Sequence, residues 1–393
     1  MKKVELLSPA GNLEKLKTAI SYGADAIFCG GKEFSLRAKA NNFTFDDLKE
    51  AVDYANIHHA KIHVTVNIVP TDTDLETLDK FLIKLDEIGV HAIIVSSIYI
   101  MKRVHDLNLK MEVHVSTQQS VANSLAVRFF KEKLNVKRVV LARESNIHNI
   151  KSIIDNNKDV EIEVFIHGGM CSSFSGRCTL SNSMSNRDAN KGGCAHSCRW
   201  AYTLYDNDKK ISDNNIILAS KDLEGVSYIK KLMDIGVDSF KIEGRMKSEY
   251  YIATVINSYR RLIDSYYNNK KINLSSIKKE IAKAENRITY TGFLSNNPKN
   301  DALLSSVGKE IPSQIFIGTI KKIENGYSYI EVRNHFKKGD KIEIFMPNKT
   351  IKTTMPSMFD KDGNEVLVAN HPMEILKVKF KQQVKENTFI RLI

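Results

Sequence analysis

The feature that most limits the possible fold is a recurring unit of one short apolar strand followed by one amphipathic helix. The predicted strands are apolar and rich in β-branched residues, as strands buried on both faces of a parallel sheet are. They cover residues 4–7, 26–29, 63–67, 92–95, 112–116, 139–142, 161–166 and 238–242. Eight such units with right-handed crossovers predict a closed (β/α)8 barrel of the TIM type, and a doubly wound open sheet is the alternative.

The pattern changes after the eighth unit. Residues 1–270 are assigned to the barrel, with a cysteine-bearing insertion at 168–215, and residues 271–312 to a linker rich in Lys, Asn and Ser. Residues 313–393 alternate apolar and polar side chains between Asn-Gly and Asp-Gly turns, which predicts a small antiparallel β-barrel domain. Such domains bind nucleic acid or serve as packing modules.

The charge of the chain points to an anionic partner. The formal net charge is +12, which favours nucleic acid, although lysine enrichment also arises from genomic base composition. No signal peptide is visible, and no apolar run approaches the roughly 18 residues that cross a bilayer. We therefore expect a cytoplasmic protein without a membrane partner.

Four of the five cysteines lie within one short segment, at Cys171, Cys178, Cys194 and Cys198. In a reducing compartment, such a group is typical of metal ligands rather than disulfides. The spacing contains no C-x2-C knuckle of a structural zinc site, so it favours a [4Fe–4S] cluster, with zinc as the alternative. Cys29 ends an apolar strand and is interpreted as a small buried hydrophobic residue.

Polar residues follow the predicted strands, at the end of a barrel where active sites are built. Candidates for catalysis are His114, Gln118, Arg143, His167 and Arg245. Candidates for binding the substrate are Arg177, Arg187, Arg199, Lys241 and Glu243, and the cations among them can hold an anionic substrate. His114, Gln118 and His167 can equally be structural hydrogen-bonding residues. The arginines of the cysteine segment can serve only to neutralise the negative charge of a thiolate cluster. Lys241, Glu243 and Arg245 alternate along one strand, so they can also pair with one another.

The cysteine segment also resembles the signature of the peptidase U32 family. The residues that match are Glu163-x-Phe165-x2-Gly168-Gly169-Met170-Cys171-x4-Gly176-x-Cys178-x-Leu180-Ser181. The continuation through Cys194 and Cys198 to Trp200 is similar to the branch of the family that hydroxylates tRNA, as is the run Lys241-Ile242-Glu243-Gly244-Arg245. Two departures are Ser197, where proline is usual, and a shortened segment between Tyr205 and Ile217.

The resemblance implies an iron–sulfur enzyme whose cluster ligands match the four clustered cysteines. It further implies prephenate-dependent, oxygen-independent formation of 5-hydroxyuridine at the wobble position 34 of tRNA. The expected partners are the tRNA anticodon loop, a small dicarboxylate co-substrate, and an electron donor or paralogous protein.

Two other functions are compatible with the sequence. The family name records a collagenase-type peptidase, but the chain contains no G-x-S-x-G or H-E-x-x-H motif. A non-catalytic scaffold that binds tRNA through a structural cluster is the third hypothesis.

Overall fold

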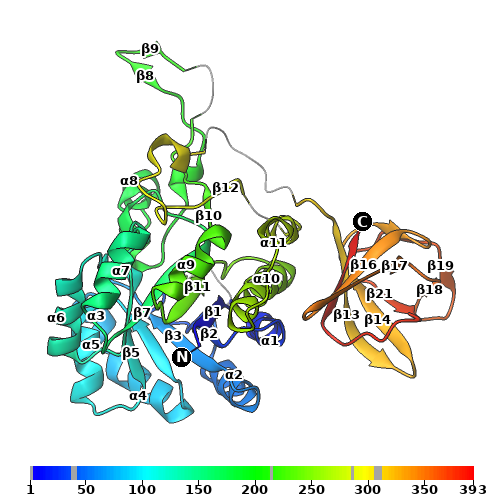
Figure 1. Ribbon diagram of the computed structural model, residues 1–393, viewed down its shortest axis with the longest axis horizontal. Helices are drawn as coiled ribbons and strands as arrows, with labels where there is room; N and C mark the ends of the chain where they lie inside the picture. Colours follow the sequence, from blue (N-terminus) through cyan, green and yellow to red (C-terminus); the bar gives the residue numbers. More distant parts are fainter. Residues whose placement is uncertain (1–2, 37–41, 213–215, 285–286, 305–311) are drawn as a thin grey trace.

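Eight parallel strands close into a barrel in the N-terminal part of the chain (Figure 1). The computed structural model describes residues 3–36, 42–212, 216–284, 287–304 and 312–393. The barrel strands are β1 (Glu5–Pro9), β2 (Ala26–Gly30), β3 (Lys61–Val66), β4 (Ala92–Val95), β5 (Glu112–Val115), β6 (Arg138–Val140), β7 (Glu161–Gly168) and β11 (Ser239–Ile242). Strand β11 pairs in parallel with both β1 and β7. This closure confirms the barrel and excludes the open sheet.

Amphipathic helices surround the barrel. They are α1 (Leu13–Ser21), α2 (Phe45–Ile57), α3 (Asp72–Leu75), α4 (Leu78–Ile88), α5 (Ile98–Asp106), α6 (Ser124–Leu134), α7 (Ile147–Asp155), α9 (Ile229–Asp234) and α10 (Glu249–Tyr267). Their starts are fixed locally: at α2, the Thr44 hydroxyl accepts from the Asp47 backbone and the Asp47 carboxylate accepts from the Thr44 backbone. The spacing of Leu75, Leu78, Leu82 and Leu85 predicts a single helix, and the structure divides this segment into α3 and α4.

The segment after the seventh barrel strand differs from the prediction. Leu223, Val226 and Ile229 recur at helical spacing, which predicts a helix that includes Leu223. Instead it lies in β10 (Asp222–Glu224), which pairs antiparallel with the end of β7. The physical reason is that β7 extends past its neighbours, and the Gly225 N–H donates to the Ile166 carbonyl at 2.7 Å.

The cysteine segment inserts between β7 and β10. It contains η2 (Phe174–Gly176), α8 (Leu180–Ser185), η3 (Ala189–Lys191), η4 (Ser197–Arg199) and a hairpin of β8 (Tyr205–Asp206) and β9 (Lys209–Lys210). In Figure 1 this hairpin projects from the top of the molecule. The insertion begins at Gly168, where φ is +99° and a Cβ atom would meet the Glu243 carbonyl oxygen at 2.1 Å. Only glycine allows the chain to leave β7 there.

The segment assigned to a linker is partly structured. It contains α11 (Leu274–Ile281), η6 (Lys299–Ala302) and β12 (Thr289–Tyr290), and β12 pairs in parallel with β10. The main barrel sheet is therefore extended by two short strands beyond its closed ring.

The C-terminal domain is an antiparallel sheet of eight strands, in the order β17-β16-β22-β13-β14-β21-β18-β19. Its strands are β13 (Phe316–Glu324), β14 (Tyr327–Val332), β16 (Lys341–Met346), β17 (Lys349–Thr354), β18 (Met358–Phe359), β19 (Glu365–Val366), β21 (Ile375–Val378) and β22 (Thr388–Leu392); β15 (Phe336–Lys337) pairs separately with β20 (Val368–Ala369). Alternate side chains of β14 and β21 are buried in a core of their own, as the alternating sequence predicts.

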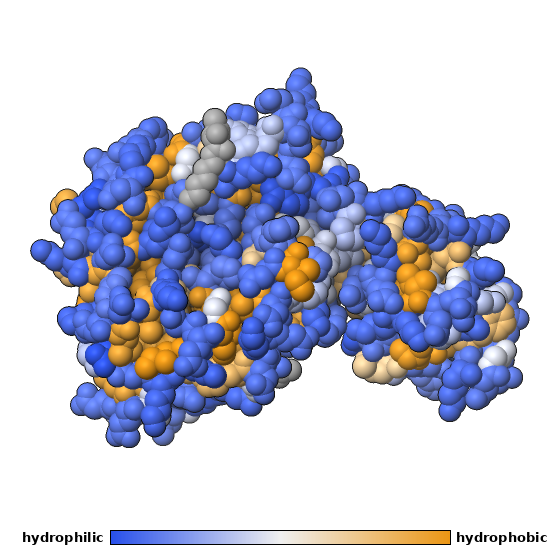
Figure 2. All heavy atoms as spheres, turned by 90° about the horizontal axis from the view of Figure 1, so that it is seen from below, coloured by the Kyte–Doolittle hydropathy of each residue, from blue (hydrophilic) through white to orange (hydrophobic). Residues whose placement is uncertain are grey.

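The two domains share a buried ionic contact. Arg391 of β22 is fully buried and donates to Glu280 of α11 at 2.6 Å and to Glu343 of β16 at 2.8 Å. The ring of Tyr250 in α10 stacks on Phe316 with centroids 4.8 Å apart. Figure 2, a view from below, shows the two lobes in contact, with hydrophilic residues over most of this face. In the part of the chain that is described, no helix is both long enough and apolar enough to span a membrane.

Candidate active site

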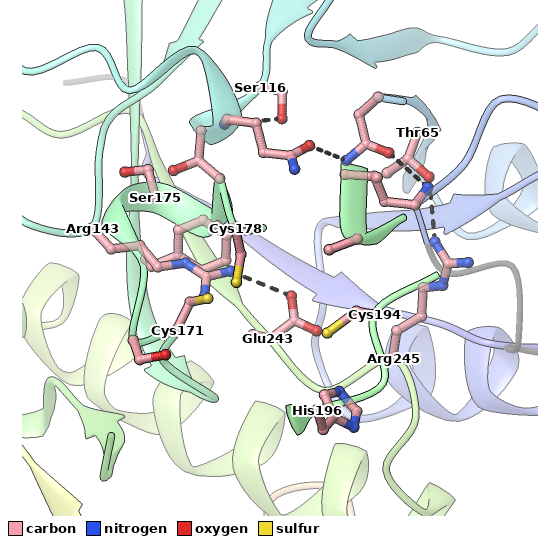
Figure 3. Close-up of a pocket in the computed structure, with 18 of the residues that line it drawn as sticks. Thr65, Ser116, Arg143, Cys171, Ser175, Cys178, Cys194, His196, Glu243 and Arg245 are labelled. Carbon is pink, nitrogen blue, oxygen red and sulfur yellow. Dashed lines mark hydrogen bonds and ion pairs between the residues drawn. The ribbon is translucent and has the colours of Figure 1, made fainter. Parts of the chain in front are cut away.

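A pocket lies where the cysteine insertion covers the C-terminal ends of the barrel strands (Figure 3). The cavity has a volume of about 170 Å³ and is lined by all four clustered cysteines. The barrel contributes its apolar floor, with Phe28, Ile94 and Phe165. The polar C-terminal ends of the barrel strands and the cysteine segment therefore meet in one site.

Three contacts fasten the insertion to the barrel. The carboxylate of Glu144 accepts from the backbone N–H of Ser175 at 2.7 Å and from its hydroxyl at 2.6 Å. The guanidinium of Arg177 donates to the Gln118 carbonyl at 2.5 Å. The ammonium of Lys191 lies 2.5 Å from the Asp74 carboxylate, which holds the pKa of Asp74 at about 2 through that hydrogen bond. These contacts hold the cysteine segment over the C-terminal end of the barrel.

The four pocket thiols are half-buried, and none forms a disulfide. In Figure 3, Cys171 and Cys178 lie near Arg143, and Cys194 lies near Glu243. Burial raises the pKa of the Cys198 thiol, and the neighbouring Cys171 and Cys194 raise it further. Across the described ranges, no three His, Cys, Asp or Glu side chains converge tightly enough to hold one metal ion. Cys29 is fully buried in β2 and is not among the residues that line the pocket, and burial raises its pKa to about 12.

Three cationic side chains face the same cavity. Arg143 donates to the Gly169 carbonyl at 2.9 Å, lies 3.7 Å from Glu243, and stacks 4.0 Å above the Phe165 ring. Its Nε atom is buried and has no hydrogen-bond partner among the described residues. The other two cations are Lys241 and Arg245. Glu243 is the one carboxylate among the described lining residues, so the net charge of the lining is positive.

Arg245 is buried and held by neutral groups. Its guanidinium donates to the Ser35 hydroxyl at 3.0 Å, to Thr65 at 3.3 Å and to Asn42 at 2.6 Å. These hydroxyl and amide oxygens orient the guanidinium, which lines the pocket.

Beneath the pocket, a buried network of charges positions Lys241. The ammonium of Lys241 lies 2.9 Å from Glu163, which also accepts from Arg138 at 3.0 Å and from Ser239 at 3.1 Å. Burial alone would raise the pKa of Glu163, but Lys241 and Arg138 lower it to about 2. The carboxylate is therefore ionised, and Lys241 is fixed between the rings of Phe28 and Phe165.

The structure brings together most of the predicted site residues, but not all of them. Those that line the pocket are Gln118, Arg143, Lys241, Glu243, Arg245 and the four cysteines. Those that are not among the lining residues are His114, His167, Arg177, Arg187 and Arg199. Lys241 lies in β11, whereas Glu243 and Arg245 follow the end of that strand, yet all three line the pocket. Lys241 contacts Glu163, Glu243 contacts Arg143, and Arg245 contacts Asn42.

The two histidines are placed in the barrel interior. His114 is fully buried, lies edge-on to His63 at 4.8 Å and contacts Glu112 at 3.1 Å. Burial lowers the pKa of His114 well below its usual value. His167 contacts the Tyr259 hydroxyl at 3.2 Å. Both have the structural surroundings of buried hydrogen-bonding residues.

Sequence reasoning missed several lining residues. Thr65, His196 and Ser197 all line the pocket but were not proposed as site residues. His196 stands between two of the clustered cysteines, which is a usable signal. Thr65 carries no such signal, because its role depends on the contact with Arg245.

Comparison with known proteins places these features in a family. The family model described as Peptidase family U32 matches residues 11–303, and the model of the U32 C-terminal domain matches residues 312–391. The chain is 40% identical to tRNA hydroxylation protein P1 of Bacillus subtilis, over 99% of this chain and 95% of the relative.

Two further relatives have different names. The chain is 36% identical to a protein of Porphyromonas gingivalis named collagenase, over 67% of this chain and 66% of the relative. It is also 36% identical to 23S rRNA 5-hydroxycytidine C2501 synthase of Escherichia coli, over 67% of this chain and 40% of the relative. The chain belongs to peptidase family U32, with both the main domain and the C-terminal domain of that family.

Proposed function

We propose that this protein is a tRNA hydroxylase that forms 5-hydroxyuridine at the wobble position. The observation that carries the proposal is one pocket that unites four thiols with three cations, in a chain that is similar along 99% of its length to a tRNA hydroxylation protein. The similarity to a 5-hydroxycytidine synthase supports C5 of a pyrimidine as the reacting atom.

We further propose that the pocket holds a [4Fe–4S] cluster through Cys171, Cys178, Cys194 and Cys198. Replacing the C5 hydrogen with a hydroxyl removes two electrons from the base, and a cluster supplies redox chemistry that protein side chains lack. Four thiolates that bind one zinc ion lie about 3.8 Å apart, given Zn–S bonds of about 2.3 Å. The thiols here line a common cavity without converging on one point, which suits a larger cage.

The pocket cations support a dicarboxylate co-substrate, which we propose to be prephenate, in a reaction that does not use dioxygen. The planar fork of arginine pairs with a carboxylate through two parallel hydrogen bonds, which a lysine cannot reproduce. Arg143 has a buried Nε atom without a partner among the described residues, and a carboxylate would satisfy it. Arg245 lines the same pocket and brings a second guanidinium group to it.

The RNA partner follows from the geometry of the reaction. The C5 atom of a uracil reaches an enclosed pocket only when the base leaves its stack, and an anticodon loop presents such a base at low cost. The net charge of +12 favours binding of the phosphate backbone.

The test is nucleoside analysis of tRNA by mass spectrometry from cells that lack this protein. 5-Hydroxyuridine should disappear, should return with the wild-type gene, and should persist during anaerobic growth. It should also fall when cells cannot form prephenate. If 5-hydroxyuridine stays unchanged while the purified protein cleaves collagen, the peptidase hypothesis replaces this one.

The co-substrate site is tested by Arg143→Lys and Arg245→Lys. At least one variant should abolish hydroxylation while the iron content and the tRNA affinity stay at wild-type levels. Full hydroxylation activity in both variants would place recognition of the co-substrate elsewhere. That result would also agree with a non-catalytic scaffold that needs its cluster but not these two arginines.

A further inference from the structure

One wall of the pocket contains two amide side chains whose orientations are set by a backbone group. The Leu36 backbone N–H donates to Oδ1 of Asn67 at 3.2 Å. Because a backbone N–H can only donate, the oxygen of Asn67 must face Leu36, and its NH2 group must face the opposite way. That NH2 group donates to Oε1 of Gln118 at 3.4 Å.

The oxygen of Gln118 therefore accepts from Asn67, and its NH2 group has no hydrogen-bond partner among the described residues. The Gln118 backbone is fixed at both sides, since its carbonyl accepts from Arg177 at 2.5 Å and its N–H donates to the Ser116 hydroxyl at 3.4 Å. Asn67 and Gln118 both line the pocket, whose lining also includes the apolar ring of Phe28. The hydrogen bonds from Leu36 to Asn67 and from Asn67 to Gln118 therefore leave the NH2 group of Gln118 as a donor for a base that enters the pocket.

We propose that Gln118 is a specificity-determining residue that selects uracil over cytosine, and that Asn67 is the residue that positions it. Uracil has a carbonyl acceptor at C4, whereas cytosine has an amino donor there. A fixed NH2 group can donate to the C4 carbonyl of uracil, whereas it meets a second donor in the C4 amino group of cytosine. The inference rests on the proposed function and adds the reason for its choice of base.

The expected size of the effect follows from base readout in general. A well-placed polar contact to a base edge discriminates by about 1–3 kcal/mol, which corresponds to about 5- to 150-fold in relative rate. Replacement of the NH2 group by an acceptor should remove this preference, because a carboxylate accepts from the cytosine amino group.

The experiment uses the full-length protein in cells that lack the native gene. Two reporter tRNAs differ only in uridine or cytidine at the wobble position, and the ratio of 5-hydroxyuridine to 5-hydroxycytidine is measured by mass spectrometry. Gln118→Glu should lower the ratio by about 10- to 100-fold. Asn67→Asp keeps the acceptor for Leu36 but loses the donor, so Gln118 can rotate. This variant should lower the ratio of 5-hydroxyuridine to 5-hydroxycytidine, because more 5-hydroxycytidine forms.

The control is Asn149→Asp, which makes the same amide-to-acid change at an exposed position of α7 and should leave the ratio unchanged. Iron content is measured for each variant, so that loss of the cluster is not mistaken for altered selection. An unchanged ratio in both Gln118→Glu and Asn67→Asp overturns the inference while the proposed function stands. Absence of both products in the wild type means that the proposed function has failed, and the inference falls with it.

Discussion

The substitution Glu163→Gln tests whether the buried charge network supports the pocket floor. Glu163 is fully buried and accepts from three donors, on Lys241, Arg138 and Ser239. Glutamine has nearly the same shape, but its NH2 group would face these donors, and it brings no negative charge. Arg138 would keep Glu5 at 2.5 Å, whereas Lys241 would lose the one carboxylate that forms an ion pair with it in the described residues.

The magnitude follows from the fate of Lys241. Removal of one partner from a buried ion pair leaves an uncompensated charge and costs about 3–5 kcal/mol. Removal of one partner from an ion pair on the surface costs far less free energy of unfolding, because water and salt screen the remaining charge. The matched control is Asp53→Asn, which breaks the exposed Lys49–Asp53 pair and should cost about 0.5 kcal/mol or less.

The assay is urea denaturation under anaerobic conditions, followed by circular dichroism at 222 nm. This signal reports the barrel helices, because the described elements of the C-terminal domain are strands. Glu163→Gln should lower the midpoint without changing the slope against urea concentration. A loss of less than about 1 kcal/mol would refute the reasoning, because Lys241 would then have to be solvated rather than held by Glu163.

Three other outcomes are expected. Cys178→Ala should lose iron and sulfide during anaerobic purification and Cys29→Ala should keep them; bleaching by Cys29→Ala, or stoichiometric zinc without sulfide, would contradict the ligand assignment. Burial lowers the pKa of His63 to about 4, so between pH 6.5 and 5 this histidine takes up protons mainly in the unfolded chain. The free energy of unfolding should therefore fall by about 1.6 kcal/mol from His63 alone over this interval; denaturation curves that do not change between these pH values would show that His63 is solvated. Lys377 lies 4.1 Å from the Tyr327 ring on the C-terminal sheet, and Lys377→Gln should reduce the slope of log tRNA affinity against log salt by about 0.7; an unchanged slope would assign this face a structural role.

Several features of this protein follow from local sequence. Each barrel strand is a short apolar run and each helix has its own apolar face and cap, so the alternation is visible without tertiary information. The four clustered cysteines are equally visible, because their ligand chemistry does not depend on neighbours. Strand β22 does not follow from local sequence, because its buried Arg391 interrupts the apolar pattern and finds its partners Glu280 and Glu343 on other elements.

The contacts that define the pocket were decided by the tertiary structure alone. Lys241 meets Glu163 across 78 positions of the chain, and Asn67 meets Gln118 across 51. His114 lies within β5 and is fully buried, whereas Gln118 lies just beyond the end of the same strand and lines the pocket. Local sequence specifies the period and polarity of each element, but closure of the barrel determines which side chains face the same cavity. Burial there determines which charges need partners, and these partners come from distant strands.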